Sequence, residues 1–146
     1  MADAAGKSDR APGRVHVRLE AGAEPVLTTA DRDAVVRVLE NLLSNAERYA
    51  TSCVTIDVRT ALPWAVLTVS DDGPGIPAAD RARVFERFAR LDEARDRDRA
   101  GAGLGLSIVA GVVTRHQGTV VVDTDPDLGG ARFVVNLPTA TAQPRP

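Results

Sequence analysis

The sequence is poor in three features that would assign it at once to a class of protein. Cys53 is the only cysteine in 146 residues, so no internal disulfide can form, and the chain suits a reducing compartment. The 18 basic and 20 acidic residues nearly cancel, which leaves no broad basic surface for a nucleic acid. No apolar stretch approaches the roughly 18 residues needed to span a bilayer, and no signal peptide is visible. We therefore expect a soluble, cytoplasmic domain that binds no nucleic acid; a longer parent protein could still be anchored in the inner or plasma membrane.

What is present is one domain between two unpatterned ends. Residues 1–13 are small and polar and predict a disordered lead-in, and residues 139–146 predict a flexible tail. A chain of this length can bury about two thirds of its unfolded surface, so residues 14–138 need no metal or disulfide to form a core. No heptad or large apolar edge stands out, which favours a monomer.

Hydrophobic patterning predicts the order of the elements. We expect strands at 15–20, 25–29, 53–60, 64–72, 118–125 and 131–138, and helices from a cap at Thr29 or Asp31 to Tyr49, over 78–88 and within 101–116. Strand runs joined as hairpins, with helices inserted between them, favour a two-layer α/β (α+β) sandwich over a doubly wound parallel fold. We expect a mixed, largely antiparallel sheet of about five strands with three helices on one face.

The helix ending at Tyr49 carries two amides where a core helix would not need them. Asn41 and Asn45 lie about 40° apart around the axis, and Arg48 falls close to Asn41, away from the apolar side. An amide oxygen can ligate a hard cation such as Mg²⁺, and a guanidinium can meet phosphate. The amides could equally cap local backbone or face solvent.

Three loops accompany this helix. In "DDGPGIP" (71–77), Asp71 ends an apolar strand and can accept a hydrogen bond from an amine, while Gly73 and Gly75 allow close approach or positive φ. "GAGLGLS" (101–107) places glycines at a helix N-terminus, a ready anion site. The charged segment 89–100 between them could be a mobile lid. Each segment also has a simpler explanation when taken alone. The first could be a tight turn, the second a glycine run of low specificity, and the charged segment a solvated linker.

Together and in this order, the motifs resemble the catalytic and ATP-binding domain of sensor histidine kinases. That domain shares a superfamily with gyrase-type topoisomerases, heat-shock chaperone ATPases and mismatch-repair ATPases. "NLLSNAERY" resembles the N box, "DDGPGIP" the first glycine box, "VFERF" the F box and "GAGLGLSIV" the second glycine box. The resemblance runs from about Val15 to Pro138, and four boxes in order are highly specific.

The resemblance implies a role for each matching residue, with ATP and Mg²⁺ as cofactors under a mobile lid. Asn45 would ligate Mg²⁺, Asn41 would support it, and Arg48 would reach phosphate; these three form the catalytic set. Asp71 would receive the adenine amino group, and Phe85 and Phe88 would anchor the base of the lid. The residues implied to bind the nucleotide are Tyr49, Asp71, Gly73, Gly75, Ile76, Phe88, Arg90, Gly101, Gly103, Leu104, Gly105 and Leu106.

The resemblance also implies an activity and a partner. Hydrolytic relatives place a Glu at the position of Asn41, and an amide cannot act as a general base. We therefore expect a protein-histidine kinase domain that holds ATP and transfers its γ-phosphoryl group to a histidine on a separate dimerisation domain, and indirectly to a response regulator. Neither His16 nor His116 precedes an acidic residue, as the phosphoacceptor does in the family, so we expect both to be structural.

Three other functions remain open at this point. An anti-sigma-factor-type serine kinase shares the N and glycine boxes, but "VFERF" and the long lid argue against it. A non-catalytic ATP-binding module is disfavoured by the intact Asn45, Asp71 and second-box glycines. A gyrase-like hydrolytic module is disfavoured by Asn41.

Overall fold

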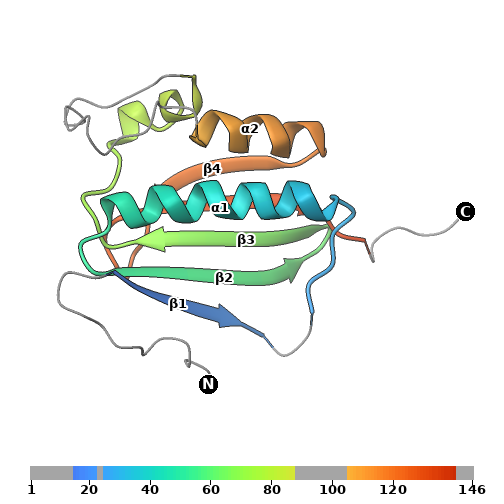
Figure 1. Ribbon diagram of the computed structural model, residues 1–146, viewed down its shortest axis with the longest axis horizontal. Helices are drawn as coiled ribbons and strands as arrows, with labels where there is room; N and C mark the ends of the chain where they lie inside the picture. The colour runs from blue at the N-terminus through green and yellow to red at the C-terminus, as the bar shows by residue number, and fades with distance from the viewer. Residues whose placement is uncertain (1–14, 23–24, 88–104, 141–146) are drawn as a thin grey trace, which may run out of the picture.

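A five-stranded sheet forms one layer of the molecule and helical segments form the other (Figure 1). The computed structural model describes residues 15–22, 25–87 and 105–140. The strands are β1 (His16–Ala21), β2 (Cys53–Ala61), β3 (Trp64–Asp71), β4 (Thr119–Thr124) and β5 (Ala131–Pro138), and the α-helices are α1 (Arg32–Tyr49) and α2 (Gly105–Arg115). The strands lie in the order β1-β2-β3-β5-β4; β1 pairs with β2 in parallel, and the other three pairings are antiparallel. The predicted two-layer sandwich with a mixed, largely antiparallel sheet is confirmed.

Helix α1 is defined by its N-cap and its apolar stripe. The Asp31 carboxylate accepts a hydrogen bond from the Ala34 N–H at 2.9 Å, so the helix begins from one of the two predicted caps. Val38, Leu42 and Ala46 recur at four-residue spacing and are almost fully buried. This packing fixes the rotation of α1 about its axis, and with it the direction of its polar stripe.

The core lies between the helices and one face of the sheet. Strand β5 alternates along its whole length, with every second side chain buried: Ala131, Phe133, Val135 and Leu137. Helix α2 adds Val109, Val112 and Val113 from the same side. Because both helices pack on one face, α1 and α2 also contact each other (Figure 1). Within the described residues, no helix is long and apolar enough to span a membrane.

Two sequence predictions differ from the structure. In place of one helix over 78–88, the described part of the segment forms two 3-10 turns, η2 (Ala78–Asp80) and η3 (Arg83–Phe85). Short helices depend on packing, and Val84 is the one buried residue in these two turns. The strand expected at 25–29 is reduced to a single bridge between Thr28 and Thr139. The expected lead-in 1–13, the lid 89–100 and the end of the tail lie outside the described residues.

Candidate active site

The polar stripe of α1 meets the beginning of α2. The Asn41 side-chain NH₂ donates to the Arg37 carbonyl at 2.8 Å, which leaves the amide oxygen directed away from its own helix. A Cβ added to Gly105 would lie 3.3 Å from that oxygen. Residues from two predicted motifs, the N box and the second glycine box, are therefore side by side, although 64 positions separate Asn41 from Gly105 in the chain.

Asn45 and Arg48 continue this stripe toward the end of α1. The Asn45 side chain is half-buried, and no hydrogen bond between described residues engages its amide. Arg48 lies exposed in the last helical turn. The two amides therefore differ. Asn41 donates to the local backbone, whereas the Asn45 oxygen is available as a ligand for a hard cation.

Asp71 is a buried carboxylate at the end of β3. The residue is 2% exposed, and its Oδ1 atom accepts hydrogen bonds from the N–H of Gly73 at 2.8 Å and of Ala131 at 3.3 Å. Both bonds go to Oδ1, and among the described residues none goes to Oδ2. Burial raises the pKa of Asp71, and the two N–H groups oppose that rise. The second oxygen can therefore accept a hydrogen bond from a single donor in a poorly solvated site, as the sequence led us to expect of a carboxylate here.

The glycines of the first glycine box are required for two different reasons. A Cβ on Gly73 would overlap the carbonyl oxygen of Tyr49, the last residue of α1. Gly75 adopts φ +80°, a conformation that side-chain-bearing residues rarely take. Close approach and positive φ were both predicted, and each occurs at one glycine. The loop is consequently packed on the backbone at the end of α1, and the Tyr49 side chain there is exposed.

Asp72 holds the other side of the loop to the chain that follows α1. Its Oδ1 accepts from the backbone N–H of Thr51, Ser52 and Cys53 at 2.8, 3.0 and 3.1 Å. Desolvation is the largest influence on its pKa and raises it, but the hydrogen bonds together outweigh desolvation and hold the pKa of Asp72 below its ordinary value. The pKa values of the adjacent carboxylates are therefore shifted in opposite directions. Asp72 uses its carboxylate to hold the backbone, whereas Asp71 keeps one oxygen open to a ligand.

Gly130 is a contributor to this site that sequence reasoning missed. A Cβ on Gly130 would overlap the Asp71 carbonyl oxygen and would lie 2.6 Å from the Gly73 nitrogen. Gly130 ends the connection between β4 and β5 and precedes Ala131, the second donor to Asp71. The only sequence signal is the pair of glycines before the last strand, and it indicates a turn rather than a distant partner.

Three more predicted residues pack under the site. Ile76, Phe85 and Leu106 are partly buried against the core cluster. The Phe85 ring meets the Phe133 ring edge to face, with centroids 6.1 Å apart at 89°. The first two residues of the F box, Val84 and Phe85, are thus anchored in the core. The other predicted nucleotide ligands lie outside the described residues: Phe88, Arg90, Gly101, Gly103 and Leu104.

The chain resembles known proteins over most of its length. Residues 30–141 match the family described as Histidine kinase-, DNA gyrase B-, and HSP90-like ATPase. The sensor protein RstB of Escherichia coli K12 is 43% identical over 122 residues, which cover 84% of this chain and 28% of RstB. The mycobacterial sensor histidine kinase MprB superposes with a TM-score of 0.71 at 33% identity, over 84% of this chain and 82% of that chain.

Full-length ShkA, solved in complex with AMPPNP, superposes with a TM-score of 0.72 at 28% identity, over 85% of this chain and 25% of that one. The chain thus spans about a quarter of the length of RstB and of ShkA. Family match, identity and fold agree: the chain belongs to the histidine kinase-, DNA gyrase B- and HSP90-like ATPase family, and its relatives are sensor histidine kinases.

Proposed function

We propose that this chain is the ATP-binding catalytic domain of a two-component sensor histidine kinase, which binds Mg-ATP and transfers the γ-phosphoryl group to a histidine on a dimerisation domain. The observation that carries the proposal is the site itself. A buried carboxylate with an open oxygen lies at one end, and an amide stripe facing a glycine-initiated helix lies at the other. These two ends match the two ends of ATP, a base with an exocyclic amine and a triphosphate.

Recognition of the base rests on Asp71. Its Oδ2 would accept a hydrogen bond from the adenine amino group, and a base without that donor would leave a buried carboxylate oxygen unpaired. Gly73 and Gly75 let the loop pass close to the base, and Ile76 and Leu106 supply apolar surface beside it. The relative ShkA was solved with AMPPNP, a nucleotide with an adenine base, which supports this assignment.

The phosphate end would hold the metal through Asn45. Mg²⁺ prefers oxygen ligands and is often bound by one or two protein groups together with substrate phosphates, a role that the half-buried Asn45 amide can fill. When bound, the ion would neutralise charge on the transferring phosphoryl group. Arg48 would contact phosphate from the last turn of α1, and the backbone at the start of α2 would offer N–H donors.

Asn41 explains why the site would transfer rather than hydrolyse. Its oxygen occupies the position beside Gly105, and an amide cannot take a proton from water. The neighbouring Glu40 is exposed and lies about 100° further around the helix, so it cannot substitute. ATP would therefore persist in the site until an acceptor histidine arrives.

The acceptor would come from a separate domain, in the same parent chain or in another protein. The two histidines of this chain have other surroundings. His16 lies in β1, and the His116 Nδ1 atom lies 2.8 Å from the Val112 carbonyl, with Nε2 3.7 Å from Asp31. A response regulator would receive the phosphoryl group next. We expect the isolated domain to be a monomer and to lie in the cytoplasm, and a longer parent protein could be anchored in the membrane.

Isothermal titration calorimetry with Mg-ATP tests the assignment. We expect the full chain to bind Mg-ATP, and Asn45→Ala and Asp71→Ala to weaken binding about tenfold or more, since each removes a hydrogen bond or ligand to a charged group. Glu40→Ala, on the same helix but outside the stripe, is the matched control and should bind as the wild type does. Unchanged affinity in both site variants would reject the site.

A further inference from the structure

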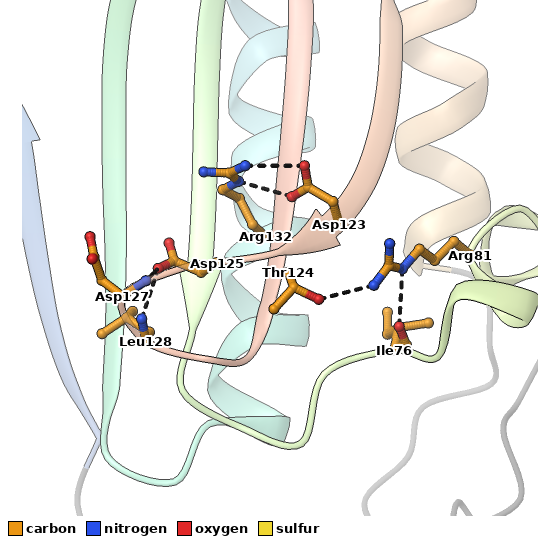
Figure 2. Close-up of polar contacts among 8 residues, drawn as sticks. All are labelled: Ile76, Arg81, Asp123, Thr124, Asp125, Asp127, Leu128 and Arg132. Atoms are coloured by element: carbon orange, nitrogen blue, oxygen red, sulfur yellow. Dashed lines mark hydrogen bonds and ion pairs between the residues drawn. The ribbon is translucent and has the colours of Figure 1, made fainter.

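Arg81 lies between the turns η2 and η3 and joins two segments that are far apart in the sequence. Its Nε donates to the Ile76 carbonyl at 3.1 Å, and its Nη2 donates to the Thr124 hydroxyl at 2.9 Å (Figure 2). Ile76 is the end of the glycine loop that begins after Asp71, and Thr124 is the last residue of β4. Arg81, a half-buried residue, therefore ties the end of that loop to the sheet.

The beginning of the same loop is attached to the same place. Thr124 is the register partner of Ala131 across β4 and β5, and the Ala131 N–H donates to Asp71 Oδ1. Gly130 leaves no room for a side chain between this strand pair and Asp71. Segment 71–76 is thus held at both ends by one pair of residues, through Ala131 at its start and through Arg81 and Thr124 at its end.

The connection between β4 and β5 is itself well braced. Asp125 Oδ1 accepts from the N–H of Asp127 and of Leu128, each at 2.8 Å (Figure 2). Two residues before Asp125, Asp123 accepts hydrogen bonds on both carboxylate oxygens from the Arg132 guanidinium, at 2.9 and 3.1 Å. Because these bonds hold the end of β4 and its connection to β5 in place, segment 71–76, which is attached there, is also held in a fixed position.

We propose that Arg81 is a positioning residue of the nucleotide site: it bridges the Ile76 carbonyl and the Thr124 hydroxyl and so holds segment 71–76 in the geometry in which Asp71 accepts the base amine. The inference rests on the proposed function. Arginine is suited to the task because its planar fork presents Nε and Nη2 in two fixed directions, whereas the single ammonium group of lysine does not.

The experiment compares two nucleotides in several variants of the full chain by calorimetry. The probes are Mg-ATP and Mg-purine riboside triphosphate, which lacks the exocyclic amine. Arg81→Met removes both contacts, Arg81→Lys keeps the charge, and Thr124→Val removes one contact from an exposed position. Arg59→Met is the control, because it removes an exposed arginine whose ion pair, with Asp57, lies within β2.

We expect Arg81→Met to weaken ATP binding about tenfold, or about 1.4 kcal/mol, and purine riboside triphosphate binding by much less. The preference for the amine should therefore shrink. Arg81→Lys should not restore this preference, and Thr124→Val should reproduce part of the loss. Arg59→Met should stay within about twofold of wild type. A double variant at 81 and 124 should lose little more than Arg81→Met alone, since both act through one contact.

Two results would overturn the inference. In one, Arg81→Met and Thr124→Val bind both nucleotides as tightly as the wild type does. In the other, they weaken binding of both nucleotides equally, as a loss of general stability would. If Arg81→Met does not fold, as judged by its melting curve, Thr124→Val decides alone. Failure of the proposed function is recognised separately, because wild-type protein would then not bind ATP, or Asp71→Ala would not weaken it.

Discussion

Replacing Asp71 by Asn should strongly weaken binding of the nucleotide while leaving the protein at least as stable as before. The amide oxygen can keep the two hydrogen bonds from Gly73 and Ala131 that now reach Oδ1. The amide NH₂ would then occupy the place of Oδ2 and would point a donor at the donor of the adenine base. Stability and binding should therefore change in opposite directions.

The size of the binding loss follows from the burial of the site. A hydrogen bond to a charged group contributes about 1.5–3 kcal/mol, and an unpaired donor that replaces it adds a further cost. Because Asp71 is 2% exposed, solvent cannot substitute for the lost partner. We expect the affinity for ATP to fall by about ten- to a hundredfold or more.

The stability change has a defined dependence on pH. The pKa of Asp71 is raised in the folded protein, chiefly by burial, so the folded state holds this proton to higher pH than the unfolded state does. The free energy of unfolding of the wild type therefore falls as pH rises above the ordinary aspartate value of about 4. The Asn variant lacks this loss, so its advantage in melting temperature should be largest near neutral pH and should shrink toward about pH 4.

Melting curves from pH 4 to 8 and calorimetry with Mg-ATP measure the two effects. Asp72→Asn is the control, since it makes the same chemical change one residue away on a carboxylate whose pKa is lowered by backbone N–H groups. It should bind ATP within about twofold of wild type, and it should gain no stability near neutral pH. The reasoning is refuted if Asp71→Asn binds ATP normally, or if it is less stable than wild type at pH 7.

Three further substitutions test separate features. Gly130→Ala places a methyl group against the Asp71 carbonyl, so denaturant unfolding should show a loss of about 1–3 kcal/mol and calorimetry a weaker ATP affinity; wild-type values for both would contradict the close contact. Asp31→Ala removes the cap on the Ala34 N–H and should cost about 1 kcal/mol by the same unfolding assay, with no loss meaning that the cap contributes nothing. Asn41→Glu supplies a general base and should raise phosphate release from ATP about tenfold or more; an unchanged rate with ATP still bound would count against the missing base as the reason for slow hydrolysis.

The elements that the sequence predicts well are those set by local rules. The cap at Asp31, the buried stripe through Leu42 and the alternation of β5 all follow from short-range patterns, and all are present. Asp71 could be recognised as a candidate because a carboxylate ends an apolar strand. Its two flanking glycines could likewise be assigned to close approach or to positive φ.

The contacts that complete the site could not be predicted in the same way. Ala131 and Asp71 are 60 residues apart in the chain, and Arg81 and Thr124 are 43 apart, so no periodicity links them. Their meeting depends on the strand order β3-β5-β4, which a single sequence does not specify. The two 3-10 turns at 78–85 were missed for a related reason, because the segment is shaped by its distant partners rather than by its own helix propensity.

Transfer of phosphate in trans tests the central claim most directly. The full chain would be incubated with Mg²⁺, γ-labelled ATP and a separate helix hairpin that carries the phosphoacceptor histidine of a sensor-kinase relative. We expect acid-labile label on that histidine, lost when the hairpin histidine is replaced and strongly reduced in Asn45→Ala. Acid-stable phosphoserine on a partner protein would contradict the assignment. So would the absence of transfer, provided that the chain binds Mg-ATP and that the hairpin accepts phosphate from its own kinase domain.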